Sequence, residues 1–463
     1  MSSDSSLRWR AASRSAVEMK ARVRSEASST RAAATDPNRI PASIHWTLLF
    51  FIFSIPFEAV DLGFGDLVSP ARVAALPFFV ACLFKPRLCF RRPSAPVWWF
   101  FAYLGFVAFG ILYVIPSDLR RPALSPFLTI VQLVIFFWIA ANLFRDRKLA
   151  GQALRTYALG VVVLAVGTLA NIPGFAASME THESVAAARV TALGYASNDL
   201  AAIAALGAVI LLGDFLGSSL KRGRRILFGI AALPLIVVVI RTGSRAGVLA
   251  LFAGLAVFLL PATGTRRQGL AVLLAAVVLL GVGYTAVTNP LLEDRFNAAY
   301  YYGDTAGHER IFNASVGMIA EKPVTGWGPT AGLLELGERL QYRATKRGGY
   351  SLRDTHNLLL YLMLEVGIIG TIPFLVGLFL VVRAAWRGRK GPLGLMPLAL
   401  IAVLLTVNLA HTFYGRKPMW LVMAVAVASA AGARTAQRVV VRRTLVVNRP
   451  RVRTGSLPGT RSA

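Results

Sequence analysis

The sequence predicts an all-α polytopic membrane protein with about 12 transmembrane helices, and three observations support this fold class. Hydrophobic residues make up 56% of the 463 residues and charged residues only 16%, with a mean hydropathy of +0.59. Apolar runs long enough to cross a bilayer core, about 18–25 residues, repeat almost end to end. Basic residues concentrate in alternate loops, as expected for a membrane protein. A soluble protein of this length would carry more charge.

The apolar runs are the expected spanning helices, and the second of them is short. They lie at residues 44–60, 71–84, 96–115, 125–144, 153–171, 197–216, 226–240, 246–262, 268–286, 357–382, 393–410 and 417–432. Because the number of runs is even, we expect both ends of the chain on the same side of the membrane.

The loops between these runs differ in charge from one side of the membrane to the other. "KPRLCFRR", "RDRK", "KRGRR", "TRR" and "RAAWRGRK" follow the second, fourth, sixth, eighth and tenth runs. They lie on the side of the Arg-rich tails, which the positive-inside bias identifies as cytoplasmic. The expected organisation is a disordered basic cytoplasmic tail over 1–41, a single transmembrane domain over 42–433 and a basic cytoplasmic tail over 434–463.

Composition also limits the kinds of function. The formal net charge is +28, but its placement follows the membrane topology, so we expect no nucleic-acid partner. Cys82 and Cys89 are the only cysteines, which leaves no disulfide framework and no cysteine metal site. The second half of the chain does not repeat the first, which disfavours a transporter built from duplicated halves.

Two long loops fall on the outer side, at residues 172–196 and 287–356. The second contains "HERIFNASVGMIAEKP", in which the apolar residues are spaced for one face of a helix. The expected face consists of Ile311, Phe312, Val316, Met318 and Ile319, with Pro323 beyond the end of the helix. Such a helix either lies on the bilayer surface or caps the bundle.

Four short outer segments contain the candidate site residues. They are "RVTALGYASNDLA" with Arg189 and Asn198, "RTGSRAG" with Arg241, Ser244 and Arg245, the helical stretch with Arg310 followed by "GWGPT", and "DTHNLLLYL" with Asp354, His356 and Asn357. Each has a plainer interpretation. Arginines at helix ends snorkel to headgroups, Trp327 suits an interfacial anchor, and Asp354 suits a helix cap.

The arginines together point to a site for a diphosphate. Guanidinium groups make bidentate, charge-assisted hydrogen bonds to phosphate oxygens, and Arg241 and Arg245 lie on the side where the positive-inside bias disfavours them. Fixed positive charge stabilises a diphosphate that acquires negative charge as its bond to carbon breaks. Many transferases use a divalent metal for this task. The outer loops contain no paired carboxylates with convincing metal-ligand spacing, so we expect neither a metal nor another cofactor.

His356 stands where the tenth apolar run begins, at the depth of the bilayer surface. An imidazole there can orient an acceptor hydroxyl or take its proton, and Asp354 is a candidate partner that orients the ring. Glu365 lies near the middle of the same run. A buried acid in a membrane helix is costly and often functional, but a hydrogen-bonded structural glutamate fits the sequence equally well.

These segments resemble the O-antigen ligase and polysaccharide polymerase superfamily of bacterial membrane glycosyltransferases. The matching pieces are "RVTALGYASNDLA", "RTGSRAGVLALFAG", "ERIFNASVGMIAEKPVTGWGP" and "THNLLLYLMLEVGIIG", which occur in family order over about residues 185–375. The resemblance implies about twelve spanning helices with a large outer loop over the cavity. It also implies metal-independent transfer of a glycan from a polyprenyl diphosphate, typically undecaprenyl diphosphate, at the outer face of the bacterial inner membrane, in cell-envelope biogenesis.

The resemblance also assigns roles to residues. The family's diphosphate-binding arginines map onto Arg189 and Arg245, its essential histidine maps onto His356, and Arg310 matches a recurring basic residue. This sequence departs from the family pattern at Ala246, where many members have glycine. Asp199 is a second departure, and its negative charge would weaken the binding of an anionic donor if it faced the cavity.

Several functions stay open at this stage. A ligase moves a finished glycan to a lipid core or another acceptor, and a polymerase moves a growing glycan to the next lipid-linked repeat unit. Transfer to a protein hydroxyl is a third option, and the sugar, linkage and acceptor are not specified by the sequence. Two alternatives belong to other functional classes. One is a flippase for lipid-linked glycans. The other is a structural or sensory membrane protein, and this alternative leaves the outer arginines unexplained.

Overall fold

The computed structural model describes residues 40–60, 69–175, 179–182, 185–217, 220–260, 266–302, 308–342 and 351–431. The chain divides into two compact units, residues 1–46 and 47–463. Helix α2 (Ala42–Ser54) begins in the first unit, and every other element below belongs to the second. The predicted tail over 1–41 falls almost wholly outside the described residues, and the tail over 434–463 falls entirely outside them.

The first half of the second unit is a succession of helices. After α2 come η1 (Ile55–Phe57), α3 (Pro70–Leu83), α4 (Pro86–Cys89), α5 (Ala95–Phe109), the π-helical η3 (Gly110–Val114), α6 (Ser117–Leu143), α7 (Arg147–Leu169) and α8 (Ser197–Leu216). Polar caps fix some starts: Asp146 accepts hydrogen bonds from the backbone N–H groups of Lys148 and Leu149 and so begins α7.

The second half adds the remaining helices. They are α9 (Arg222–Arg241), α10 (Arg245–Val257), α11 (Arg266–Val287), α12 (Pro290–Tyr302), α13 (His308–Glu321), α14 (Ala331–Arg339), α15 (Leu358–Gly388) and α16 (Met396–Ala410), followed by a last helix, Lys417–Ala431. α15 is a merger of two helical stretches across a kink at Gly367. Each predicted apolar run coincides with a helix.

Six of these helices are long and apolar enough to cross a membrane. They are Ala95–Val114, Ser117–Leu143, Arg147–Leu169, Ser197–Leu216, Arg222–Arg241 and Leu358–Gly388. Six shorter apolar helices accompany them: Ala42–Phe57, Pro70–Leu83, Arg245–Val257, Ala275–Thr285, Met396–Ala410 and Lys417–Ala431. The chain is therefore a helical, multi-pass membrane protein.

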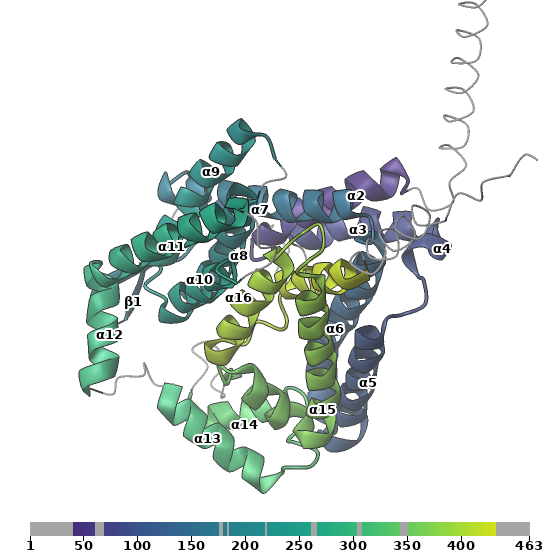
Figure 1. The fold of residues 1–463 in the computed structure, drawn as a ribbon. Helices are drawn as coiled ribbons and strands as arrows, with labels where there is room; N and C mark the ends of the chain where they lie inside the picture. Colours follow the sequence, from purple (N-terminus) through teal and green to yellow (C-terminus); the bar gives the residue numbers. More distant parts are fainter. Residues whose placement is uncertain are drawn as a thin grey trace, which may run out of the picture. The chain divides into compact units, whose positions relative to one another are not determined.

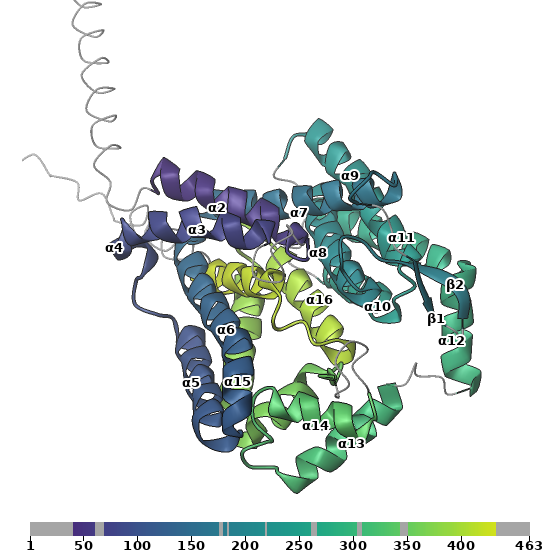
Figure 2. The same ribbon diagram turned by 180° about the vertical axis from the view of Figure 1, so that it is seen from behind.

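α8 is the most enclosed of the six long helices, with 83% of its apolar window buried. It packs against α7, α9, α10 and α16 (Figures 1 and 2). Its sequence is rich in alanine and glycine, and small residues let neighbouring helices approach closely. Gly207, for example, leaves room for Val161 of α7. The beginning of α8 is therefore a fixed point, and it contributes two residues to the candidate site.

α15 is the second organising helix, and it lies beside α5 in both views (Figures 1 and 2). Phe100 of α5 contacts Phe374 of α15 and Trp420 of the last helix at ring-centroid distances of 5.3 and 5.2 Å. Such edge-to-face pairs add stability beyond the burial of their area. This aromatic packing fixes α15, whose first turn follows the candidate catalytic histidine.

The helical conformation of α15 is interrupted at Gly367, where the backbone adopts φ 62°. A Cβ atom at this position would collide with the Val324 carbonyl group, so only glycine fits without a shift of the backbone. The interruption frees backbone groups for the segment before α14: Ile368 N donates to Pro323 O at 2.9 Å and Trp327 N donates to Leu364 O at 2.8 Å. The "GWG" turn is therefore docked directly on α15.

In the described part of the predicted outer loop 287–356 there are three helices, α12, α13 and α14. The predicted helix in this region is confirmed as α13, but its buried face is narrower than expected. Ile311, Met318 and Ile319 are buried, whereas Phe312 and Val316 are exposed. The buried residues pack against Leu336 of α14 and against Leu360 and Leu364 of α15. α13 and α14 therefore cover the amino-terminal part of α15 (Figure 1).

The other long loop that was predicted on the outer side, 172–196, contains an element that the sequence did not predict. Two short strands, β1 (Met179–His182) and β2 (Val185–Val190), pair antiparallel, with Arg189 opposite Glu180. The predicted helical fold class is right for the membrane-spanning elements, and this strand pair is an addition outside them.

Candidate active site

His356 lies in a short turn immediately before α15. Its backbone φ of 53° is in the left-handed region, which is uncommon for a residue other than glycine. The next residue, Asn357, caps α15 by accepting hydrogen bonds from Leu359 N and Leu360 N at 2.9 and 3.2 Å. Its side-chain amide also donates to Leu409 O at the end of α16, at 2.9 Å. Asn357 therefore holds the His356 turn between two helices.

The His356 side chain is mostly shielded from solvent, with 22% of it exposed. Its Nδ1 atom lies 3.5 Å from Asp354 Oδ2, yet Nδ1 is buried and has no hydrogen-bond partner in the described part of the chain. Burial, followed by the positive charges of His308, Arg353 and His411, lowers the pKa of His356 to about 3. The ring is therefore neutral at physiological pH and has a lone pair available for a proton.

Cationic and imidazole groups surround this ring. The His308 ring, at the start of α13, has its centroid 5.0 Å from that of His356. The guanidinium of Arg353 stacks over the Tyr342 ring at 4.4 Å. Asp354 lies among them, and burial raises the pKa of its carboxyl group. Positive groups are thus concentrated where an anionic group of a substrate would be stabilised.

A second histidine, His411, faces the first. The rings of His356 and His411 are stacked, with centroids 6.2 Å apart and planes inclined by 25°. His411 follows α16, and its Nε2 atom lies 2.9 Å from Asp199 Oδ1, so Nε2–H donates to the carboxylate. The Nδ1 atom of His411 is buried without a hydrogen-bond partner in the described part of the chain. The hydrogen bond to Asp199 therefore fixes the orientation of the His411 ring.

Asp199 belongs to a buried network of charges at the beginning of α8. Its second carboxylate oxygen accepts a hydrogen bond from Arg416 at 2.7 Å, and its side chain is only 5% exposed. Arg416 also lies 3.9 Å from Glu58, which accepts a hydrogen bond from Lys417 at 2.8 Å. The negative charge of Asp199 is thus compensated by Arg416, and it does not stand alone against an anionic donor.

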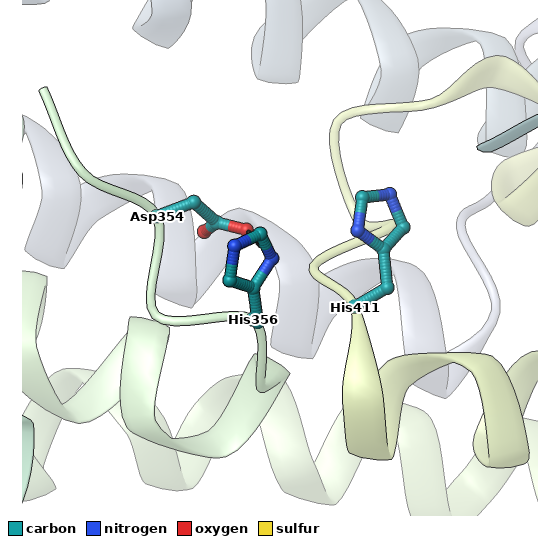
Figure 3. A group of neighbouring side chains, drawn as sticks. All are labelled: Asp354, His356 and His411. Carbon is teal, nitrogen blue, oxygen red and sulfur yellow. Dashed lines mark ion pairs between the residues drawn. The ribbon is translucent and has the colours of Figure 1, made fainter. Parts of the chain in front are cut away.

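Asp354, His356 and His411 form a group whose nitrogen and oxygen donor atoms all lie within 4.8 Å of one another. Figure 3 shows the His356 ring between the Asp354 carboxylate and the His411 ring. Two imidazoles and a carboxylate are a donor set that suits Zn²⁺ and other divalent metals. The sequence analysis expected no metal, and it did not bring these residues together as a group.

The "RTGSRAG" turn meets the beginning of α8. Ser244 donates its hydroxyl hydrogen to Asn198 Oδ1 at 2.9 Å and accepts from Gly247 N at 3.2 Å, so it caps α10. Arg245 is the first residue of that helix and is half-buried. Because Asn198 directly precedes Asp199, the start of α10 is connected through α8 to His411 and then to His356.

The other predicted arginines are placed differently. Arg189 lies in β2, and the structure describes its backbone only. Arg241 is exposed at the last turn of α9. Arg310 is exposed on α13, two positions after His308. Residues two apart on a helix point to nearly opposite faces, so Arg310 lies on the side of α13 away from the His308 ring.

Glu365 has a structural contact in this region. Its Oε1 atom accepts a hydrogen bond from the backbone N–H of Thr330 at 2.8 Å. Thr330 precedes α14 and has a φ of 69°. The carboxylate therefore joins α15 to the segment between α13 and α14, which agrees with the structural interpretation of this residue.

The sequence analysis missed His411, Arg416, His308 and Arg353 as parts of the site. A signal for the first two exists in "HTFYGRK", residues 411–417, which follows the eleventh apolar run on the predicted outer side. Arg416 and Lys417 break the positive-inside bias there in the same way as Arg241 and Arg245 do. The pairing of His411 with Asp199 depends on tertiary structure and has no local signal.

Comparison with known proteins adds one family. The family profile described as O-antigen ligase matches residues 230–375. The matched segment runs from α9 into α15 and contains Ser244, Arg245, Arg310 and His356. A search of curated proteins found no match. The profile match confirms the resemblance to the O-antigen ligase superfamily.

Proposed function

We propose that this chain is a membrane glycosyltransferase that moves a glycan from a polyprenyl diphosphate, typically undecaprenyl diphosphate, to an acceptor hydroxyl at the outer face of the membrane. The observation that carries the proposal is the position of His356 inside a segment that matches the O-antigen ligase family. The ring is neutral, mostly shielded from solvent and surrounded by positive groups at the start of a membrane-spanning helix. At that depth a lipid-borne diphosphate meets a hydroxyl from the aqueous phase.

We propose a topology of twelve spans with both termini cytoplasmic in a bacterial inner membrane. The six long and six shorter apolar helices support this count if the shorter ones cross a locally thinned or packed region of the bilayer. The alternation of basic loops supports the orientation. In this arrangement, the segment 287–356 and the loop with His411 both lie on the outer side.

In the proposed reaction, the acceptor oxygen forms a bond to the anomeric carbon of the donor glycan. The bond between that carbon and the diphosphate oxygen breaks, and the diphosphate leaves with the electron pair. The hydroxyl proton passes to the free lone pair of His356. A group with a pKa near 3 is a weak base in the empty site, but the negative charge of a bound diphosphate raises the pKa of a nearby imidazole.

Arg245, Arg189 and Arg310 are proposed to bind the diphosphate. Arg245 has the best support, because Ser244 fixes the start of its helix against Asn198. Arg310 has less support, because it is exposed on the opposite side of α13 from His308. Arg353 is an additional candidate, since its charge already acts on His356. Compensation of Asp199 by Arg416 and His411 supports the use of this region by an anionic donor.

We propose that the transfer needs no metal. The group of Asp354, His356 and His411 offers a direct test of this point, because a divalent metal bound there would occupy the nitrogen that His356 needs for the proton. Removal of metal with EDTA should leave transfer unchanged, and added Zn²⁺ should inhibit it. Loss of activity on EDTA treatment, restored by one metal, would make the three residues a catalytic metal site.

The function is tested by incubating the purified full chain with a polyprenyl-diphosphate oligosaccharide and a series of acceptors. Free polyprenyl diphosphate and glycan size are followed together. A single shift in acceptor mass indicates a ligase, and a ladder of products indicates a polymerase. A polymerase would use the same diphosphate-binding arginines and the same histidine. Movement of the donor across vesicle membranes without any release would overturn the transferase and support a flippase.

A further inference from the structure

A cavity of about 370 Å³ lies at the end of α15 opposite to His356. It is formed by the beginning of α5, the end of α6, the end of α15 and the last helix, which come together from distant parts of the chain. α5, α6 and α15 run side by side in both views (Figures 1 and 2). The stretch of α15 after the kink at Gly367, residues 368–388, spans about 30 Å, the thickness of a bilayer core, so its two ends face opposite sides of a bilayer.

The charged residues that line this cavity are all arginines: Arg145, Arg383 and Arg387. Arg383 and Arg387 are one helical turn apart on α15, a spacing at which like charges repel. Burial, followed by the charge of Arg91, lowers the pKa of Arg145. No carboxylate is among the lining residues. Asp146, the nearest acid in sequence, is engaged as the cap of α7.

The remaining lining of the cavity consists of a few polar side chains and a mostly apolar surface. The hydroxyl of Ser94 lines the cavity and is buried without a hydrogen-bond partner in the described part of the chain. Trp138 and Asn142 also line it, and each donates a hydrogen bond to the backbone of the segment before α5, to Arg91 O at 2.8 Å and to Cys89 O at 3.0 Å. The rest of the lining is mostly alanine with Leu380 and Val427.

We propose that this cavity binds the phosphodiester headgroup of an anionic phospholipid from the leaflet that faces the carboxyl end of α15. Three guanidiniums supply bidentate donors for phosphate oxygens, and the Ser94 hydroxyl supplies one more. Basic pockets between membrane helices are suited to such headgroups because the acyl chains stay in the bilayer while the phosphate enters the pocket. The site is separate from the transferase site, and it does not depend on the proposed reaction.

The test measures lipid binding to the full chain by native mass spectrometry, with phosphatidylglycerol as the probe and phosphatidylcholine as the neutral lipid. The double variant Arg383→Gln/Arg387→Gln removes two charges from the cavity. The matched control is Arg222→Gln/Arg224→Gln. It also removes two exposed charges on the predicted cytoplasmic side of the membrane, but these charges lie outside the cavity. Ala384→Leu fills the cavity without changing the charge, and it keeps the test decisive if the arginine variant does not fold.

The wild-type chain should bind phosphatidylglycerol in preference to phosphatidylcholine. The cavity variant should bind phosphatidylglycerol about tenfold or more weakly, Ala384→Leu should bind it weakly as well, and the control pair should bind it like the wild type. Equal losses in the cavity and control variants would overturn the proposal, because they would indicate attraction by net charge alone. Displacement of the lipid by millimolar inorganic phosphate would also overturn it, since the ligand would then be a soluble anion.

Discussion

The imidazole rings of His356 and His411 lie face to face, with centroids 6.2 Å apart, but their hydrogen bonding differs. His411 donates through Nε2 to Asp199, which is itself bound by Arg416. The Nδ1 atom of His356 lies 3.5 Å from Asp354 and has no hydrogen-bond partner among the residues that the structure describes. The two histidines are therefore not interchangeable: His411 is held in one orientation, whereas His356 is available to take a proton.

Replacement of His411 by alanine should slow transfer about tenfold to a hundredfold, mainly in kcat. The substitution removes the ring that faces His356 and leaves Asp199 with Arg416 alone. His411→Gln should recover part of the rate, because its amide can still donate to Asp199. Wild-type activity in His411→Ala would show that the second histidine is only a neighbour. His45→Ala, which alters a ring packed on Trp46 in α2, is the control.

The pKa of His356 gives the chain a pH-dependent stability. This pKa is about 3 in the folded chain and about 6.5 in an unfolded chain. Between these values only the unfolded state binds the proton, so the free energy of unfolding falls as the pH drops below about 6.5. At pH 5 the loss from this one group is about 2 kcal/mol.

The variant His356→Gln should therefore lose less thermal stability than the wild type between pH 7 and pH 5. Melting in detergent at the two pH values measures the difference, with His45→Gln as the control. Identical pH dependence in wild type and His356→Gln would mean that the folded chain does not disfavour the protonated ring.

Substitutions of Arg245 and Arg241 should differ in their effect on transfer, because the two arginines lie at different places in the fold. Arg245→Ala should raise the KM for the donor or lower kcat/KM by about tenfold to a hundredfold, the effect of one lost charge-assisted hydrogen bond. Arg241→Ala should have an effect of less than about threefold, because Arg241 is exposed at the end of α9. Initial rates over a range of donor concentrations measure both. The reverse order would move the diphosphate away from the start of α10.

Asn357 should affect both the stability of α15 and the geometry of the site. Asn357→Ala removes the helix cap, at a cost of about 1 kcal/mol, together with the hydrogen bond to Leu409 O. Asn357→Asp keeps the cap but cannot donate to Leu409 O. A melting curve and a transfer assay on both variants separate the two roles: the aspartate variant should melt near the wild-type temperature and still transfer more slowly. If both properties of Asn357→Asp equal those of the wild type, the hydrogen bond to α16 does not position His356.

The helices were predictable from the sequence because apolar runs of spanning length leave few alternatives in a membrane. The polar structure between them was less predictable. The described part of the loop 287–356 contains three helices, and only α13 was predicted. α14 is amphipathic as well, but it has only 9 residues and so gives a short pattern. The buried face of α13 excludes Phe312 and Val316, because the partners on α14 and α15 cover only a narrow stripe. The strand pair around Arg189 has no comparable signal.

The candidate site was predictable in part for a similar reason. His356, Asn357 and Ser244 stand at helix boundaries that the sequence marks, and the structure gives Asn357 and Ser244 the roles of caps. Asp199 looked unfavourable for an anionic donor. Its compensation by His411 and Arg416 joins α8 to a loop more than 200 positions later, and such a contact cannot be inferred from one sequence alone.

The most direct test of the account is the rate at which the full chain releases free polyprenyl diphosphate from a lipid-linked oligosaccharide in the presence of an acceptor, compared between wild type and His356→Ala. The account predicts a rate about 10² to 10⁴ times lower for His356→Ala, with donor binding within about threefold of wild type and His45→Ala fully active. Release at the wild-type rate by His356→Ala would contradict the central claim that His356 takes the proton of the acceptor hydroxyl.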